Sequence, residues 1–265
     1  MIKACFFDID GTLIPFHTNT MPESTRSALE TLRRKGIKLF LATGRGPQHI
    51  GFMEKLFDFD GAVTFNGQYC FDKSGIFLDR PLSSEAVSGA FSYLQKNQIA
   101  GKFETVEDGF YNLVNDRVRD INARARALFR MLDLHDPEPR PDEITALKQP
   151  VYQITVFVSP REEAGMMRCL PGCKGLRWSD EFVNVVDQNG GKAAGIEEVC
   201  KKYGFGQKEI IAFGDGGNDI DMLEYAGIGI AMGNAGADAK AAADYVTTAV
   251  DDNGICNALK HFEVI

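Results

Sequence analysis

Apolar and amphipathic stretches alternate along the first part of the chain and predict its local structure. Residues 2–9 are almost continuously apolar, which is typical of a strand buried on both faces of a parallel sheet. Residues 22–35 begin with proline, carry their apolar side chains on one face and end in basic residues before Gly36, so they predict a helix. A second strand is expected over 38–43. The order strand, helix, strand predicts the beginning of an α/β sheet.

The same alternation returns toward the C-terminus. Strands are predicted over 209–213 and 228–231, and helices over 192–203, 219–225, 237–244 and 253–261. We therefore expect an α/β fold whose core is a doubly wound, Rossmann-like parallel sheet.

Between these two parts the pattern changes. Two short apolar runs, 62–65 and 68–71, flank Asn66-Gly67, and Asn-Gly tolerates the positive φ angles of a type I′ turn, so a two-residue β-hairpin is predicted. Further along, the pattern predicts helices over 84–96, 117–132 and 160–170, strands over 102–106, 111–114, 152–158 and 176–178, and a proline-rich loop over 137–141.

These elements suffice for a second α/β domain. We expect this cap domain to occupy residues 83–182 and to be inserted into a catalytic core formed by residues 1–82 and 183–265.

Composition narrows the functional classes. Twenty-nine basic and 37 acidic residues give a net charge of −8, which disfavours nucleic acid and anionic membranes as partners. No apolar run approaches the roughly 18 residues of a membrane span, so a cytoplasmic location is expected. The six scattered cysteines predict free thiols, and no neighbouring ligand completes a metal site around Cys169 and Cys173.

Chemistry-bearing residues follow the predicted strands. Asp8-Ile9-Asp10-Gly11-Thr12 stands at the carboxyl end of the first strand, where open α/β sheets bind their ligands. The two carboxylates could serve as a nucleophile and an acid/base, or could belong to a solvated Asp-Gly turn. Thr43-Gly44-Arg45 follows the second strand and offers donors for phosphate oxygens, although a strand-to-helix cap is the preferred explanation for this segment taken alone.

Two further segments complete the set. Gly214-Asp215-Gly216-Gly217-Asn218-Asp219 follows a late strand, and Lys192 begins a predicted helix. In one parallel sheet, Asp8, Asp10, Asp215 and Asp219 would converge at one edge and repel one another unless cations intervene. Lys192 and a divalent metal meet that need, and a few hard oxygen ligands favour Mg²⁺ over Zn²⁺ or Ca²⁺.

In their order and spacing, these four segments resemble the four motifs of the haloacid dehalogenase superfamily of phosphatases. The chain is most similar to the Cof-type sugar-phosphatase branch, whose α/β cap lies between the second and third motifs. Asn66-Gly67 and Met232-Gly233-Asn234-Ala235 also look like features of that branch.

The resemblance implies a role for each motif residue. Asp8 is expected to attack phosphorus and form an aspartyl-phosphate, while Asp10 protonates the leaving alcohol and later deprotonates water. The resemblance places Mg²⁺ on the Asp8 carboxylate, the Asp10 main-chain carbonyl and Asp215, with Asp219 in support. It assigns phosphoryl oxygens to Thr43, Gly44, Lys192 and Asn218, and it places Arg45 toward the cap and leaving group or toward solvent.

The predicted function is Mg²⁺-dependent hydrolysis of a small phosphorylated metabolite, such as a sugar phosphate, by a monomer or small homo-oligomer. Asp10 favours phosphoryl chemistry over dehalogenation, because a halide leaves without a proton. A phosphosugar mutase or phosphotransferase, and a non-catalytic phosphate-acceptor module, remain as alternatives.

Substrate choice is expected to depend on the cap, because only the leaving group differs between substrates. Four side chains there are of the type that contacts sugars, although packing in the cap core is the preferred explanation for them: Phe110, Tyr111, Arg177 and Trp178. A run of cap arginines is more typical of a solvated helix face: Arg117, Arg119, Arg124, Arg126 and Arg130.

Overall fold

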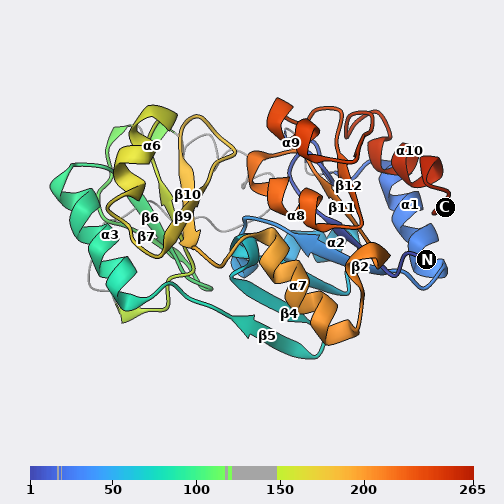
Figure 1. Ribbon diagram of the computed structural model, residues 1–265, viewed down its shortest axis with the longest axis horizontal. Coiled ribbons are helices and arrows are strands. Elements are labelled where there is room, and N and C mark those ends of the chain that lie inside the picture. The colour runs from blue at the N-terminus through green and yellow to red at the C-terminus, as the bar shows by residue number, and fades with distance from the viewer. Residues whose placement is uncertain (17, 19, 117–118, 121–147) are drawn as a thin grey trace. The chain divides into compact units, whose positions relative to one another are not determined.

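The computed structural model describes residues 1–16, 18, 20–116, 119–120 and 148–265. The chain forms two compact units (Figure 1). The first unit comprises residues 1–44, 53–79 and 190–265, and the second comprises residues 45–52 and 80–189. The helix expected at 117–132 falls almost entirely outside the described residues, and the loop expected at 137–141 lies wholly outside them.

The first unit is built on an eight-stranded sheet in the order β13-β12-β11-β1-β2-β3-β4-β5. All neighbours from β13 to β3 pair in parallel, and β4 and β5 continue the sheet as antiparallel strands. The strands are β1 (Ala4–Phe7), β2 (Lys38–Ala42), β3 (Gly61–Thr64), β4 (Tyr69–Asp72), β5 (Gly75–Asp79), β11 (Ile210–Gly214), β12 (Ile228–Ala231) and β13 (Tyr245–Val246). The expected parallel-sheet core is confirmed, and β5 and β13 are strands that the sequence analysis did not predict.

Helices cover this sheet on both faces. Phe6 and Phe40 stack on one face, where α7 (Lys192–Tyr203), α8 (Ile220–Tyr225) and α9 (Ala237–Ala242) contribute to the same apolar core. The helices α1 (Glu23–Arg34) and α10 (Gly254–His261) pack against each other, and the short α2 (Gly51–Leu56) follows β2. Because β1 is central and buried on both faces, the loop that follows it lies amid the ends of neighbouring strands.

The predicted hairpin is present, but its predicted turn is wrong. Thr64 pairs with Tyr69, so the connection has four residues, 65–68, instead of two. Phe65, Asn66 and Gly67 all have positive φ angles, and the first and third of them bound a short 3₁₀ turn. The turn is longer because the main chain of Asn66 hydrogen-bonds to Thr43 and Gly191 and not across the hairpin.

The second unit contains a five-stranded antiparallel sheet in the order β7-β6-β8-β10-β9. Helices α3 (Ser84–Lys96) and α6 (Pro160–Met167) pack on one apolar face of it. The strands are β6 (Gly101–Glu104), β7 (Gly109–Tyr111), β8 (Gln153–Val156), β9 (Cys173–Leu176) and β10 (Val183–Asp187).

Three details of this unit differ from the sequence analysis. The unpredicted strand β10 pairs with β8 and β9, so residues 183–189 belong to the second unit and not to the core segment beginning at 183. β7 begins two residues before the strand predicted at 111–114, and β9 begins three residues before the strand predicted at 176–178.

Within the described residues, no helix combines the length and the apolar character needed to cross a bilayer.

Candidate active site

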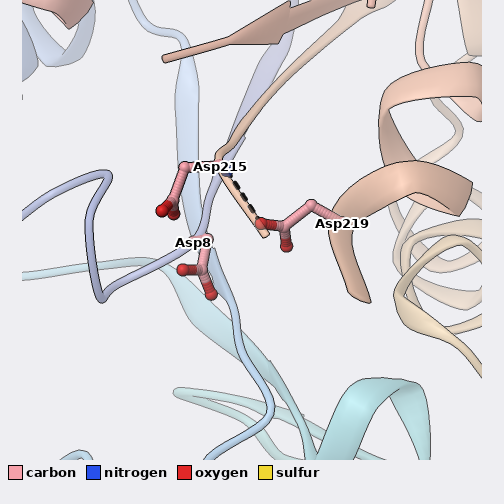
Figure 2. Close-up of side chains that lie close together, drawn as sticks. All are labelled: Asp8, Asp215 and Asp219. Atoms are coloured by element: carbon pink, nitrogen blue, oxygen red, sulfur yellow. Dashed lines mark hydrogen bonds between the residues drawn. The ribbon is translucent and has the colours of Figure 1, made fainter. Parts of the chain in front are cut away.

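Three aspartates meet at the carboxyl ends of two neighbouring strands of the first unit, β1 and β11 (Figure 2). Asp8 follows β1, Asp215 follows β11, and Asp219 lies in the 3₁₀ turn just beyond. Each offers a carboxylate oxygen, and these oxygens all lie within 4.8 Å of one another. The side chains are buried, with 8%, 6% and 0% of the residue exposed. Parallel pairing of β1 with β11 explains the convergence, since it brings the ends of both strands to one edge.

Lys192 brings a positive charge to this cluster. It is the first residue of α7 and is fully buried. Its Nζ donates to Oδ1 of Asp8 at 2.6 Å and to Oδ1 of Asp219 at 2.5 Å. Burial alone would lower the pKa of this ammonium, but the Asp219 and Asp8 carboxylates outweigh burial and hold the pKa above its ordinary value. Lys192 therefore stays charged throughout the physiological range.

Asp219 orders the loop that carries Asp215. Its Oδ2 accepts hydrogen bonds from the backbone N–H groups of Asp215, at 2.9 Å, and Gly216, at 2.8 Å. The first of these bonds is the dashed line in Figure 2. With Oδ1 on Lys192, both oxygens of Asp219 are engaged. This carboxylate therefore fixes the positions of other groups and has little freedom to react.

Burial and like charge raise the pKa values of the other two aspartates. The pKa of Asp8 is raised to about 7, because burial and the charges of Asp219 and Asp10 together outweigh the opposing effect of Lys192. Burial also raises the pKa of Asp215 to about 8, with the charges of Asp8 and Asp219 adding to the effect and a 3.1 Å hydrogen bond from Thr12 opposing it. The cluster thus holds more negative charge than one ammonium balances.

This donor set fits a divalent cation. Three carboxylates offer hard oxygen ligands within reach of one point, and added positive charge would relieve the repulsion that raises the pKa values of Asp8 and Asp215. Oxygen ligands of this kind are typical of Mg²⁺ sites, whereas zinc sites typically use nitrogen and sulfur ligands.

Asp10 lies beside the cluster but its side chain is outside the group of three. It forms an isolated bridge with Ile14, and its charge contributes to the raised pKa of Asp8. The chain turns after Asp10 at Gly11, whose φ is +79°. A Cβ atom on Gly11 would lie 2.3 Å from Oδ2 of Asp215. A side chain at position 11 would therefore displace the carboxylate, which explains the glycine after Asp10.

Three of the candidate phosphate-binding residues gather around Asn66 in the first unit. Asn218 donates from Nδ2 to Oδ1 of Asn66 at 3.0 Å. A Cβ atom on Gly44 would lie 3.1 Å from Nδ2 of Asn66 and 3.5 Å from Nδ2 of Asn218. Thr43, next to Gly44, is 1% exposed. The structure thus brings Thr43, Gly44 and Asn218 together around Asn66.

Three site residues were not assigned by the sequence analysis: Thr12, Asn66 and Asn234. Asn234 donates to the carbonyl of Gly11 at 2.8 Å and accepts from the N–H of Val250 at 2.9 Å, so it braces the turn beside Asp215. For two of these residues the sequence carries a signal: the dipeptide Asn66-Gly67 and the segment around Asn234 both resemble features of the family, but neither resemblance implies a role. Their function depends on partners far away in sequence.

Arg45 and Arg177 contact other residues of the second unit. Arg45 belongs to the second unit, where its guanidinium donates to the carbonyl of His49 at 3.4 Å and lies 5.4 Å from the ring centre of Phe52. Arg177 uses its guanidinium N–H groups on Glu163 and on the carbonyls of Ser179, Phe182 and Val158.

The aromatic candidates divide into buried and exposed side chains. Tyr111 is 4% exposed and stacks with Phe157, and the partly buried Phe110 packs against the apolar core of the second unit. Trp178 is 45% exposed, yet its indole N–H donates to Oδ1 of Asn184 at 2.8 Å. Of these aromatic candidates, Trp178 alone combines a fixed orientation with an exposed ring. Among the cap arginines, Arg119 forms an exposed ion pair with Asp116, and the other four lie outside the described residues.

Comparison with known proteins agrees with this geometry. The family model described as haloacid dehalogenase-like hydrolase matches residues 5–259. YkrA of Bacillus subtilis, provisionally named as a phosphatase, is 32% identical over 266 residues, covering 99% of this chain and 98% of YkrA. The 5-amino-6-(5-phospho-D-ribitylamino)uracil phosphatase YitU of Bacillus subtilis is 24% identical over 272 residues, covering 96% and 95% of the two chains.

A solved structure extends the likeness to the fold. BT4131, described as a sugar phosphatase of subclass IIB of the superfamily, is 37% identical and matches with a TM-score of 0.90, covering 99% of this chain and 100% of BT4131. The chain belongs to the haloacid dehalogenase-like hydrolase family, and within that family it is a phosphatase.

Proposed function

We propose that this phosphatase hydrolyses small phosphate monoesters, with sugar phosphates as its substrate class, through an aspartyl-phosphate on Asp8 and with Mg²⁺ as its cofactor. The observation that carries the proposal is the buried group of Asp8, Asp215 and Asp219, in which Lys192 pairs with Asp8 and Asp219. The likeness to BT4131, described as a sugar phosphatase, supports the substrate class. The six free thiols suit a reducing cytoplasm.

The residues of the first unit divide the work. Asp8 attacks phosphorus, and the alcohol oxygen leaves with the electron pair of the broken P–O bond. Asp10 gives that oxygen a proton and then takes one from the water that hydrolyses the acyl-phosphate. Lys192 balances the Asp8 and Asp219 charges and, with Thr43, the Gly44 N–H and Asn218, binds phosphoryl oxygens.

The metal would be held by the carboxylates of Asp8 and Asp215 and by the main-chain carbonyl of Asp10, with Asp219 supporting the Asp215 loop. When bound, Mg²⁺ would offset the negative charge of the carboxylates and of the phosphoryl group so that the two can approach. We assign choice of the leaving group to the second unit, with Trp178 as the side chain best suited to contact a sugar.

A substrate screen tests the proposal directly. Purified protein, first treated with chelator, is assayed with and without added Mg²⁺ against sugar phosphates, nucleotides and phosphorylated vitamins, with release of inorganic phosphate as the readout. We expect phosphate release that requires Mg²⁺ and is fastest with a sugar phosphate. An isomeric sugar phosphate as product would identify a mutase, and a long-lived phosphoenzyme without turnover would identify a phosphate acceptor. Full activity in chelator would contradict the metal assignment.

The two proton transfers of Asp10 have their own test. In Asp10→Asn, p-nitrophenyl phosphate should still phosphorylate Asp8, because nitrophenolate leaves without a proton, whereas hydrolysis of the phosphoenzyme lacks its base. We expect a burst approaching one nitrophenol per active site, followed by slow turnover. Equal loss on p-nitrophenyl and sugar phosphates, with no burst and no trapped phosphoenzyme, would contradict the dual role.

A further inference from the structure

The loop between β3 and β4 holds an unusual backbone conformation in the interior of the first unit. Three successive residues have positive φ angles: 49° at Phe65, 50° at Asn66 and 86° at Gly67. Phe65 and Asn66 are fully buried. A left-handed conformation is unfavourable for a bulky residue such as phenylalanine and persists only where surrounding contacts hold it. The contacts around Asn66 therefore indicate which interactions hold the loop in this conformation.

Asn66 bonds to three segments that are distant in sequence. Its N–H donates to the carbonyl of Thr43 at 3.0 Å, and its carbonyl accepts from the N–H of Gly191 at 2.8 Å. Its side-chain Oδ1 accepts from Nδ2 of Asn218 at 3.0 Å. One residue thus contacts the loop after β2, the residue before Lys192 and the loop after β11. Each of these segments carries a candidate phosphoryl ligand.

Glycines on both sides make these approaches possible. A Cβ atom on Gly67 would lie 1.8 Å from the carbonyl oxygen of Gly191, so any side chain at position 67 would separate the loop from the start of α7. A Cβ atom on Gly44 would press against the amide of Asn66 at 3.1 Å. Substitution at either glycine would therefore move the phosphate-binding segments apart.

We propose that Asn66 is a positioning residue for the phosphoryl group and that it acts mainly by orienting the amide of Asn218. This rests on the proposed function, since it concerns the phosphate-binding side of the same reaction. An amide presents NH₂ on one side and an oxygen on the other. The Oδ1 of Asn66 accepts one N–H of Asn218, which leaves the second N–H to point at a phosphoryl oxygen. Without that acceptor, Asn218 can turn its own oxygen toward the phosphate and repel it.

A double-mutant cycle separates this role from simple packing. Asn66→Gly keeps a residue that adopts positive φ without strain, and it removes the acceptor. We expect kcat/KM to fall about 10- to 100-fold, because Asn218 no longer holds an N–H toward the charged phosphoryl group. The Kd for inorganic phosphate, measured by calorimetry, should rise by a similar factor. In an Asn218→Ala background, the same substitution should change both quantities less than threefold. Additive losses in the double variant would overturn the proposal.

The matched control is Asn253→Gly. Asn253 also has a positive φ, 59°, but it is exposed and precedes α10. We expect this variant to keep wild-type kcat/KM and phosphate affinity, while its change in melting temperature calibrates the backbone effect of the substitution. If Asn66→Gly loses phosphate affinity only in proportion to a lower melting temperature, the loop has a structural role alone.

A second variant keeps the test decisive if Asn66→Gly does not fold. Asn66→Asp tolerates the same conformation and keeps an oxygen that accepts from Asn218, but it puts a carboxylate beside Gly44 and Asn218. Phosphate binding should therefore weaken more than tenfold by repulsion, and Asn218→Ala in this background should cause a further loss, because Asn218 is still oriented. Unchanged phosphate affinity in Asn66→Asp, or no further loss on adding Asn218→Ala, would refute the proposal. Phosphate release by the wild-type protein tests the proposed function independently, because a wild type that hydrolyses no ester fails before any variant is compared.

Discussion

Two buried carboxylate sites in the first unit have opposite electrostatics. Asp72, at the end of β4, accepts hydrogen bonds from the N–H and Oγ of Ser74 at 2.7 and 2.6 Å and from the hydroxyl of Tyr203 at 2.9 Å, and it pairs with Lys202 at 2.7 Å. Burial would raise the pKa of Asp72, but these donors outweigh burial and hold the pKa well below its ordinary value. At Asp8 and Asp215 the pKa values are raised.

The difference lies in the supply of donors and not in burial. Asp72 has a cation and three neutral donors of its own, whereas Asp8 and Asp219 share the ammonium of Lys192 and Asp215 lies beside both of them. A fully satisfied carboxylate stabilises the fold. A crowded set of carboxylates destabilises the metal-free fold, and a bound cation would relieve the same crowding.

The largest expected effect is loss of catalysis in Asp8→Asn. The amide is nearly isosteric with the carboxylate but is not a nucleophile, so kcat on p-nitrophenyl phosphate should fall by several orders of magnitude. Metal-free stability should stay equal or increase, because one of the crowded charges is gone. Urea unfolding in chelator measures it. More than about a tenth of the wild-type kcat would remove Asp8 from the nucleophile role.

Lys192→Met should lower the free energy of unfolding of the metal-free protein. Three buried carboxylates would remain without an ammonium, and removing one partner of a buried ion pair costs about 3 to 5 kcal/mol. We expect this loss in the free energy of unfolding in chelator at pH 7, and partial recovery on addition of Mg²⁺. The matched variant Lys202→Met removes the cation beside Asp72 at a half-exposed position and should cost about 1 kcal/mol, with no recovery by Mg²⁺. Equal losses in the two variants would contradict the contrast between the sites.

The two sites should also give stability opposite pH dependences. The folded pKa values of Asp8 and Asp215, about 7 and about 8, lie above the unfolded value of about 3.9. Between pH 4 and 8 the folded metal-free protein therefore binds more protons than the unfolded chain, and each group lowers stability by up to about 1.4 kcal/mol per pH unit as pH rises. Asp72, whose folded pKa is depressed, contributes stability above pH 4 that is lost on acidification. Urea unfolding in chelator across this range measures the slope, and Asp8→Asn should flatten it.

Asp72→Asn should affect stability moderately and leave catalysis unchanged. Loss of charge weakens the bonds from Lys202 and Tyr203, and the free energy of unfolding should fall by about 1 to 3 kcal/mol while kcat stays unchanged. Asp58→Asn makes the same change at an exposed ion pair, where side-chain exposure is 62%, and should cost less than about 1 kcal/mol. A loss of activity in Asp72→Asn without a loss of stability would show that Asp72 has a catalytic connection.

The sequence by itself determined much of the first unit. The bounds of α7 and β12 match the predicted ranges, because strands buried on both faces are continuously apolar and their helices carry clear start and stop signals. α3 of the second unit also matches, since Ser83 supplies its N-cap. The convergence of Asp8 with Asp215 followed from the rule that parallel strands end at one edge of a sheet.

Tertiary structure decided the rest. β5 is largely exposed, and the valines of β10 are interrupted by Asn184 and followed by Asp187, so neither strand carries the continuous apolar signal of a buried parallel strand. The four-residue turn at Asn66 depends on Thr43, Gly191 and Asn218, and no local pattern encodes partners at such separations. The contrast between Asp72 and Asp8 has the same origin. A pKa depends on which donors the fold brings within about 3 Å of the carboxylate, and only the folded chain brings them there.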